Sequence, residues 1–166
     1  MALRSAARRT LMAGALAAAA WALAAPSCQA GTFYVLEGDR EKVSFIDRDS
    51  LVVSKQFRAA WITTIYAKDQ VTPGIPMPYR VAMFHFVIDC ALRREQSLGG
   101  LVYDEDRKTI HALGVGSAWR DIVAKSNGDM MQSYSCGRSA WRGVPISGDI
   151  PDLERRFAAL LAAGSL

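Results

Sequence analysis

The amino-acid sequence predicts a single α+β domain. We expect an antiparallel β-sheet of about five or six strands, with one or two C-terminal helices packed on one face and tied to it by a disulfide. The first observation is an apolar run over residues 79–90, in which both alternating faces are mostly apolar, as in a strand covered on each side. The second is that further alternating runs follow one another across short turns, with no helical pattern between them. That order favours antiparallel pairing over a parallel sheet.

The first thirty residues are typical of an export signal rather than of a folded domain. A positively charged start is followed by an alanine- and leucine-rich stretch, residues 11–25, that is short for a membrane span. Small residues one and three positions before Gly31 predict cleavage there. We therefore expect a signal peptide over residues 1–30 and one exported domain over residues 31–166. The charged start contains Arg4, Arg8 and Arg9.

Two details of this signal stay open. Arg8 and Arg9 form the pair that marks a twin-arginine export signal, but such a pair also arises by chance in an ordinary signal. Cys28 is a candidate for lipidation, although Pro26 is awkward in a lipidation motif and no leucine stands three residues before the cysteine. The sequence favours removal of Cys28 over a lipid anchor. We expect a periplasmic or cell-envelope protein. It would contact the membrane only during export or, if Cys28 is kept, through the lipid attached to Cys28.

The charge balance does not indicate a nucleic-acid partner. The chain has 20 basic and 16 acidic residues, but three arginines and none of the acids fall within residues 1–30. Residues 31–166 therefore carry a net charge of about +1, whereas a nucleic-acid-binding domain needs a basic face.

The cysteine count predicts one disulfide. If Cys28 is removed with the signal, Cys90 and Cys136 remain. An even pair in an exported domain most often forms a disulfide, and closing a loop of this length is worth about 3–4 kcal/mol. A metal site would need further ligands nearby, which the sequence does not supply.

Most of the expected strands lie before residue 114. The run over residues 58–67 is rich in threonine and aromatic residues, which favours a strand over a helix. Three prolines between residues 71 and 78 predict a surface loop, because proline cannot donate to a sheet ladder. The expected strands are residues 32–36, 42–46, 51–53, 58–67 and 79–90, followed by a hairpin of residues 97–103 and 108–113.

The C-terminal part is expected to hold the helices. Residues 119–123 read as a turn or short helix, and Ser126 or Asn127 is placed to cap a short helix over residues 128–136. Asp149 precedes the clearest helical pattern, which spans residues 151–163 and starts with proline. The apolar stripe of that last helix, spaced to dock on a sheet, is Leu153, Phe157, Leu160 and Leu161.

No group of residues has the pattern of a catalytic, metal or cofactor site. His85 reads as a packed residue within a strand and His111 as a surface residue, without the close spacing of a metal pair. No serine or cysteine is paired with a base in a recognisable nucleophile motif. We therefore expect no enzyme activity, no bound metal and no cofactor.

Exposed aromatic and basic residues make a better candidate. Trp119 and Trp141 lie in the loop-rich C-terminal part beside Arg120 and Arg142, and tryptophan and arginine are the residue types that anchor protein contacts. These four residues are the candidate binding surface. The alternative is that both tryptophans pack the helices onto the sheet.

The order of landmarks resembles the surface-adhesin protein E family of small bacterial envelope proteins, over about residues 32–137. The resemblance implies an antiparallel sheet with a helix tied to it by the Cys90–Cys136 disulfide. The loop over residues 73–78 and the helix after Gly137 depart from the family pattern. The landmarks are Phe45-Ile46-Asp47-Arg48-Asp49-Ser50, Trp61, Tyr79-Arg80, Ile88-Asp89-Cys90, Leu101-Val102-Tyr103-Asp104, Trp119 with Ile122, and Cys136-Gly137.

The resemblance also shapes the functional expectation. The member that gives the family its name binds host matrix proteins, while many relatives have no established role. We expect a non-catalytic exported envelope or periplasmic binding protein, adhesin-like in function, whose partner is an envelope or host matrix protein. The alternative is a periplasmic inhibitor of a cell-wall enzyme such as lysozyme, which is also built on a small disulfide-tied sheet.

Overall fold

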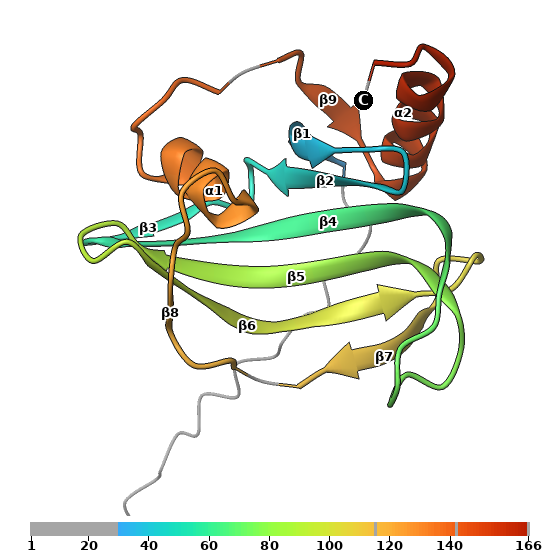
Figure 1. Ribbon diagram of the computed structural model, residues 1–166, viewed down its shortest axis with the longest axis horizontal. Coiled ribbons are helices and arrows are strands. Elements are labelled where there is room, and N and C mark those ends of the chain that lie inside the picture. Colours follow the sequence, from blue (N-terminus) through green and yellow to red (C-terminus); the bar gives the residue numbers. More distant parts are fainter. Residues whose placement is uncertain (1–29, 115, 142, 166) are drawn as a thin grey trace, which may run out of the picture.

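A single twisted antiparallel sheet of nine strands forms the centre of the molecule (Figure 1). The computed structural model describes residues 30–114, 116–141 and 143–165. The strands are β1 (Gly31–Gly38), β2 (Lys42–Asp47), β3 (Val52–Ser54), β4 (Phe57–Gln70), β5 (Tyr79–Asp89), β6 (Arg94–Tyr103), β7 (Thr109–Leu113), β8 (Arg120–Asp121) and β9 (Ile146–Gly148). The described residues form two helices, α1 (Asn127–Ser135) and α2 (Ile150–Ala162).

The sheet confirms the predicted fold class and adds to it. The strand order is β7-β6-β5-β4-β2-β1-β9, with β3 paired to the start of β4 and β8 paired to the start of β6. All of these pairings are antiparallel. The described residues form nine strands rather than five or six, and the two strands that the sequence did not indicate, β8 and β9, contribute only two and three residues. The turn or helix expected at residues 119–123 contains β8 instead.

The two helices cover opposite faces of the sheet, which corrects the expectation that one face carries them. Strand residues alternate between faces. On β1, Phe33 belongs to the cluster of buried residues that contains Phe157 of α2, which we call the α2 core. Its neighbour Tyr34 belongs to the cluster that contains Met131 of α1, which we call the α1 core. The same alternation separates Phe45 from Ile46 on β2. Strands with two apolar faces accept a helix on either side, so the sequence pattern did not decide between them.

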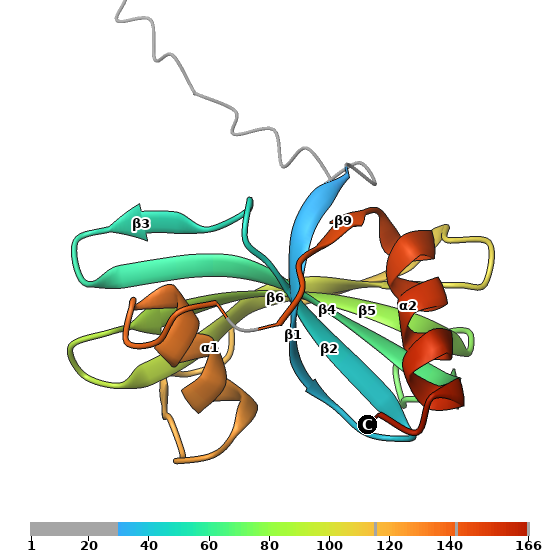
Figure 2. The same cartoon turned by 90° about the horizontal axis from the view of Figure 1, so that it is seen from above.

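Neither helix is long enough to cover the whole of its face. At about 1.5 Å per residue, α2 with 13 residues is about 20 Å long and α1 with nine is about 14 Å long. At about 3.3 Å per residue, β4 with 14 residues spans about 46 Å. Figure 2 shows the helices at opposite ends of the sheet. One part of each face is therefore left without a helix.

Helix α2 begins with a capping box. The backbone N–H of Asp152 donates to the Asp149 carboxylate at 3.4 Å, and the backbone N–H of Asp149 donates to the Asp152 carboxylate at 2.9 Å. The second bond lowers the pKa of Asp152 from its ordinary value. Leu153 and Phe157, from the predicted stripe, are buried against the sheet.

Replacing Asp149 with alanine is expected to lower the free energy of unfolding by about 1 kcal/mol, because it removes the acceptor for the Asp152 N–H. Urea unfolding of both proteins would measure the change. Asparagine at this position keeps an acceptor and is expected to restore most of the loss. Equal losses for alanine and asparagine would contradict the capping role.

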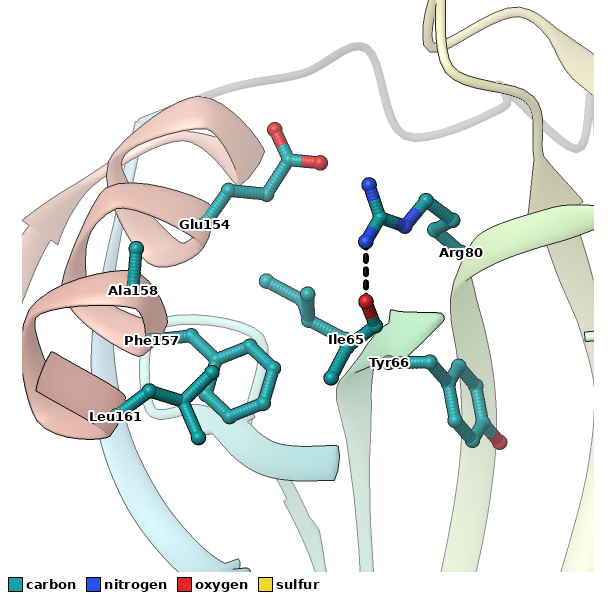
Figure 3. A pocket seen from close by; sticks show the side chains of 8 residues that line it. Ile65, Tyr66, Arg80, Glu154, Phe157, Ala158 and Leu161 are labelled. Atoms are coloured by element: carbon teal, nitrogen blue, oxygen red, sulfur yellow. Dashed lines mark hydrogen bonds between the residues drawn. The ribbon is translucent and has the colours of Figure 1, made fainter. Parts of the chain in front are cut away.

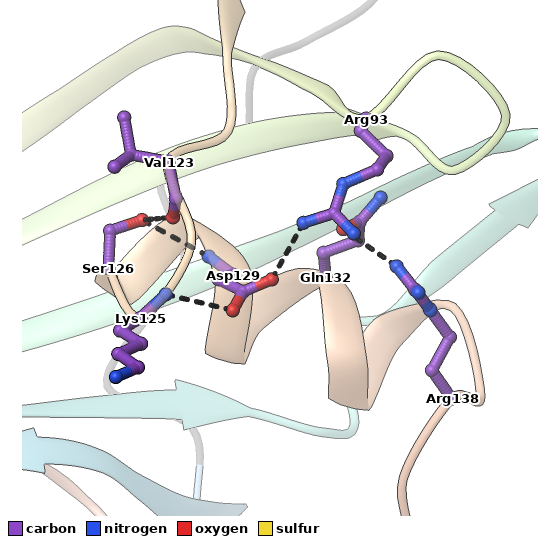
Figure 4. Close-up of polar contacts among 7 residues, drawn as sticks. All are labelled: Arg93, Val123, Lys125, Ser126, Asp129, Gln132 and Arg138. Atoms are coloured by element: carbon purple, nitrogen blue, oxygen red, sulfur yellow. Dashed lines mark hydrogen bonds and ion pairs between the residues drawn. The ribbon is translucent and has the colours of Figure 1, made fainter.

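Helix α1 is fastened at both ends. At its start the Ser126 hydroxyl accepts from the Asp129 N–H, and Arg93 forms a 3.0 Å ion pair with the Asp129 carboxylate (Figure 4). At its end Cys136 is bonded to Cys90, with Cα atoms 5.8 Å apart, as the sequence predicted. The loop after β5 and the helix therefore hold each other in place.

The predicted signal peptide lies outside the described residues, apart from Ala30. The first strand, β1, starts at Gly31, where the sequence places the beginning of the exported domain. Neither α1 nor α2, the helices found in the described ranges, is long and apolar enough to cross a membrane.

Candidate functional site

The α2-facing side of the sheet has an aromatic region that α2 does not reach. Strand residues two apart share a face, so Trp61 on β4 and His85 on β5 lie on the same side as the α2 core residues Ile65 and Val81. We call this region the open sheet face. It consists of Phe57, Trp61, His85, Val87 and Trp119, all of which are partly exposed.

Two stacked rings form the middle of the open sheet face. Trp61 and His85 are paired across β4 and β5, and their ring centroids are 4.8 Å apart with an angle of 10° between the planes. The backbone N–H of Trp61 donates to the Ser50 hydroxyl at 2.9 Å. Partial burial lowers the pKa of His85 below its ordinary value of 6.5, so the imidazole is neutral at pH 7. The stack is thus an uncharged aromatic platform.

Stability is expected to depend on the charge of His85. Because the pKa of His85 is lower in the folded state than in the unfolded chain, the unfolded state binds the proton more readily. The free energy of unfolding should therefore fall as the pH drops below about 6.5. Urea unfolding between pH 5 and 8 would compare wild type with His85→Gln. The variant should lose less stability on acidification, and parallel curves for the two proteins would contradict the expectation.

Trp119 lies at one end of the open sheet face. Its ring lies 6.1 Å from the ring of Phe57, and the Arg94 guanidinium carbon is 5.4 Å from the Trp119 centroid, within the range of a cation–π contact. Arg94 also lies 3.6 Å from the buried carboxylate of Asp89, which is the cross-strand partner of Phe57. With 36% of its surface exposed, Trp119 packs on the sheet and also faces solvent.

The other members of the predicted surface lie elsewhere. Arg120 follows Trp119, but it pairs with Glu95 at 2.8 Å on the α1 side of the sheet. Trp141 is half-buried between Tyr34 of β1 and Tyr134 of α1, with ring centroids 5.0 and 5.2 Å away. It has the packing role that the sequence left as an alternative. Arg142 lies outside the described residues. These residues therefore do not form one patch, and Trp119 alone belongs to the open sheet face.

Sequence reasoning did not include Trp61 and His85 in the candidate surface. Both faces of β5 are apolar, which suggests that each is covered, and His85 was expected to be packed. Two features together could have indicated this surface. Trp61 and His85 lie on the same face of their neighbouring strands, and the C-terminal helix is too short to cover the full length of those strands. That signal depends on the register between β4 and β5, which the sequence does not give.

A pocket of about 200 Å³ lies between α2 and β4, and its charged groups already have partners (Figure 3). Phe157 and Ile65 form its apolar floor, and Arg80 and Glu154 stand on opposite sides. The Arg80 guanidinium donates to the Ala67 carbonyl, and Glu154 accepts from Arg107 at 2.7 Å. No buried side-chain polar atom lining this pocket lacks a partner within the described residues.

The open sheet face has the chemistry of a contact surface. The two tryptophans, with Phe57 and Arg94, are residue types enriched where proteins bind one another. The other histidine, His111, is on β7, two strands away from β5, so the two histidines do not form a pair. No group of three or more potential metal ligands comes together within the described ranges.

Comparisons with known proteins place the chain in a family. The model of the surface-adhesin protein E family matches residues 33–137. A solved structure of Haemophilus influenzae protein E, in its crystal form II, is 15% identical, with a TM-score of 0.47, covering 68% of this chain and 91% of that one. Another structure of the same protein is 14% identical, with a TM-score of 0.47, covering 71% and 92%. No curated protein sequence matches the chain. Because the family model spans more than half of the sequence, this chain belongs to the surface-adhesin protein E family.

Proposed function

We propose that this protein is a non-catalytic, exported binding protein of the bacterial cell envelope, and that it holds a host matrix or envelope protein on its open sheet face. Membership of the surface-adhesin protein E family supports the adhesin-like role. The observation that carries the choice of surface is the Trp61–His85 stack, which stays partly exposed. A contiguous patch of large apolar residues that stays in contact with solvent is a marker of a contact surface.

A bound partner would bury the aromatic side chains of the open sheet face. Trp61, Phe57 and Trp119 expose rigid apolar area, and burying such area on binding is favourable by about 25 cal/mol per Å². Their rings are held by stacking and by strand pairing, so little side-chain entropy is lost on binding. Arg94, next to Trp119, supplies a cation at the edge of the face. The comparisons do not support the lysozyme-inhibitor alternative, and we do not propose it.

A binding screen tests the proposal. Purified residues 31–166 would be immobilised with the disulfide intact and exposed to a panel of extracellular-matrix proteins and to envelope proteins from the native cell. We expect saturable binding of at least one of them. Binding should survive a rise in salt, because the face is mainly aromatic. Failure of every protein to bind, together with turnover of a cell-wall substrate by the purified domain, would overturn the proposal.

A further inference from the structure

A second pocket lies on the α1 side of the sheet, on the opposite side from the open sheet face. It has a volume of about 220 Å³ and lies between the start of α1 and strands β2, β4, β5 and β6. We call it the α1 pocket. Its apolar floor is formed by Leu36, Ile62, Phe84 and Phe86. Its polar rim is formed by Lys42, Glu95, Arg120 and Asn127.

The charged groups of the rim come in pairs. The Arg120 Nε donates to the Glu95 carboxylate at 2.8 Å, and the Lys42 ammonium is 3.4 Å from the carboxylate of Glu37 just outside the pocket. The α1 pocket is therefore close to neutral as a whole. The ion pair engages one of the five N–H donors of the Arg120 guanidinium, whose side chain is 62% exposed. Donors are thus available at the rim although its charge is balanced.

Two buried acceptors of the pocket residues have no donor in the described part of the chain. They are one carboxylate oxygen of Glu95, Oε2, and the amide oxygen of Asn127. Glu95 is only 7% exposed, and buried acceptors are normally satisfied. Oε2 lies against Gly128 at the start of α1, where an added Cβ would be 2.5 Å away. Because Glu95 also lines the α1 pocket, Oε2 is an acceptor that a donor group bound in the pocket would satisfy.

We propose that the α1 pocket binds one neutral, polyhydroxylated ring, that is, a single sugar unit. A free anion would meet the carboxylates of Glu95 and Glu37, and a free cation would meet Arg120 and Lys42. A hydroxyl group both donates and accepts, so it is suited to bridge Glu95 and Arg120 without disturbing their charge balance. This site is separate from the proposed protein-binding face and does not depend on it.

The floor and the size of the pocket fit the same ligand. The rings of Phe84 and Phe86, 6.1 Å apart, offer an apolar surface for the C–H face of a sugar ring. A volume of about 220 Å³ is below the range of about 300–1,000 Å³ that is typical of sites for drug-sized ligands. One ring fits this space, and a lipid or a longer saccharide would extend beyond it.

Titration calorimetry with residues 31–166 tests the proposal. The probes are N-acetylglucosamine, glucose and galactose, with acetate and butylamine as the anionic and cationic comparisons. We expect saturable, millimolar binding of at least one sugar and none of acetate or butylamine. Saturable binding of acetate or butylamine in preference to the sugars would overturn the proposal, as would the absence of saturation with all three sugars.

Two substitutions of opposite charge separate the ligand classes. Arg120→Gln and Glu95→Gln should each weaken sugar binding by about tenfold, because each removes a charge-assisted hydrogen bond. An anionic ligand would instead bind more tightly to Glu95→Gln, and a cationic ligand more tightly to Arg120→Gln. Either of these two results contradicts the sugar assignment.

Control variants keep the result independent of folding. Arg156→Gln changes an exposed arginine of α2, on the other face of the sheet, and should leave sugar binding unchanged. Lys42→Gln alters the opposite side of the rim and should weaken binding even if Glu95→Gln proves unstable. Circular dichroism would confirm that each variant is folded. Loss of sugar binding in Arg156→Gln but not in Lys42→Gln would overturn the proposal.

Discussion

Replacing both Cys90 and Cys136 with alanine is expected to lower the free energy of unfolding by about 4 kcal/mol. The disulfide joins residues 46 positions apart, and a cross-link over a loop of this length removes that much chain entropy from the unfolded state in the loop-closure model. It also fastens α1 to the end of β5, so its loss should loosen the helix first. Urea unfolding of the oxidised wild type and the double variant would measure the difference.

Reduction provides the matched control for this variant. A reducing agent should bring the unfolding midpoint of the wild type down to that of the double variant and leave the variant itself unchanged. A wild type that keeps its midpoint after complete reduction would show that the Cys90–Cys136 bond adds little to the fold.

Phe45→Ala is expected to cost about 3–5 kcal/mol, and Trp61→Ala less than half of that. Phe45 is fully buried on β2 beneath α2, so its truncation leaves a cavity in the core. Trp61 lies on the same face of the sheet but beyond the reach of α2, and it is partly exposed. Although tryptophan is the larger side chain, a smaller fraction of the Trp61 surface leaves water on folding. Urea unfolding of the two variants would compare the losses.

The comparison tests where the α2 core ends. If Trp61→Ala costs as much as Phe45→Ala, the open sheet face is part of the core and is not available to a partner. A Val87→Ala variant adds a smaller residue from the open sheet face to the comparison, and it should also cost less than a fully buried valine such as Val43.

Local sequence signals predicted the long elements well. The long run that is apolar on both faces identified β5, the threonine and aromatic residues identified β4, and the Asp149 cap with a nearby proline identified α2. The cysteine pair was also correct, because an even number of cysteines in an exported domain leaves few alternatives. These features depend on residues close in sequence or on a small count of cysteines.

Features that depend on pairing between distant segments were not predictable in this way. Strand β9 has three residues, two of them Ser147 and Gly148, and forms a strand only because β1 offers it an edge. The separation of Trp119 from Trp141 follows from β8 pairing with β6 while the chain returns to β1. The exposure of the Trp61–His85 stack results from helix length measured against strand length, a comparison that needs the packed structure.

The affinity of one double variant tests the binding role of the open sheet face most directly. Trp61→Ala/Trp119→Ala would be compared with wild type for the matrix or envelope protein selected in the screen, with Val144→Ser, an exposed substitution away from the open sheet face, as the control. We expect at least a tenfold loss of affinity in the double variant, because buried tryptophans dominate the energy of protein interfaces, and no change in the control. Wild-type affinity in a folded double variant would show that the partner binds another surface.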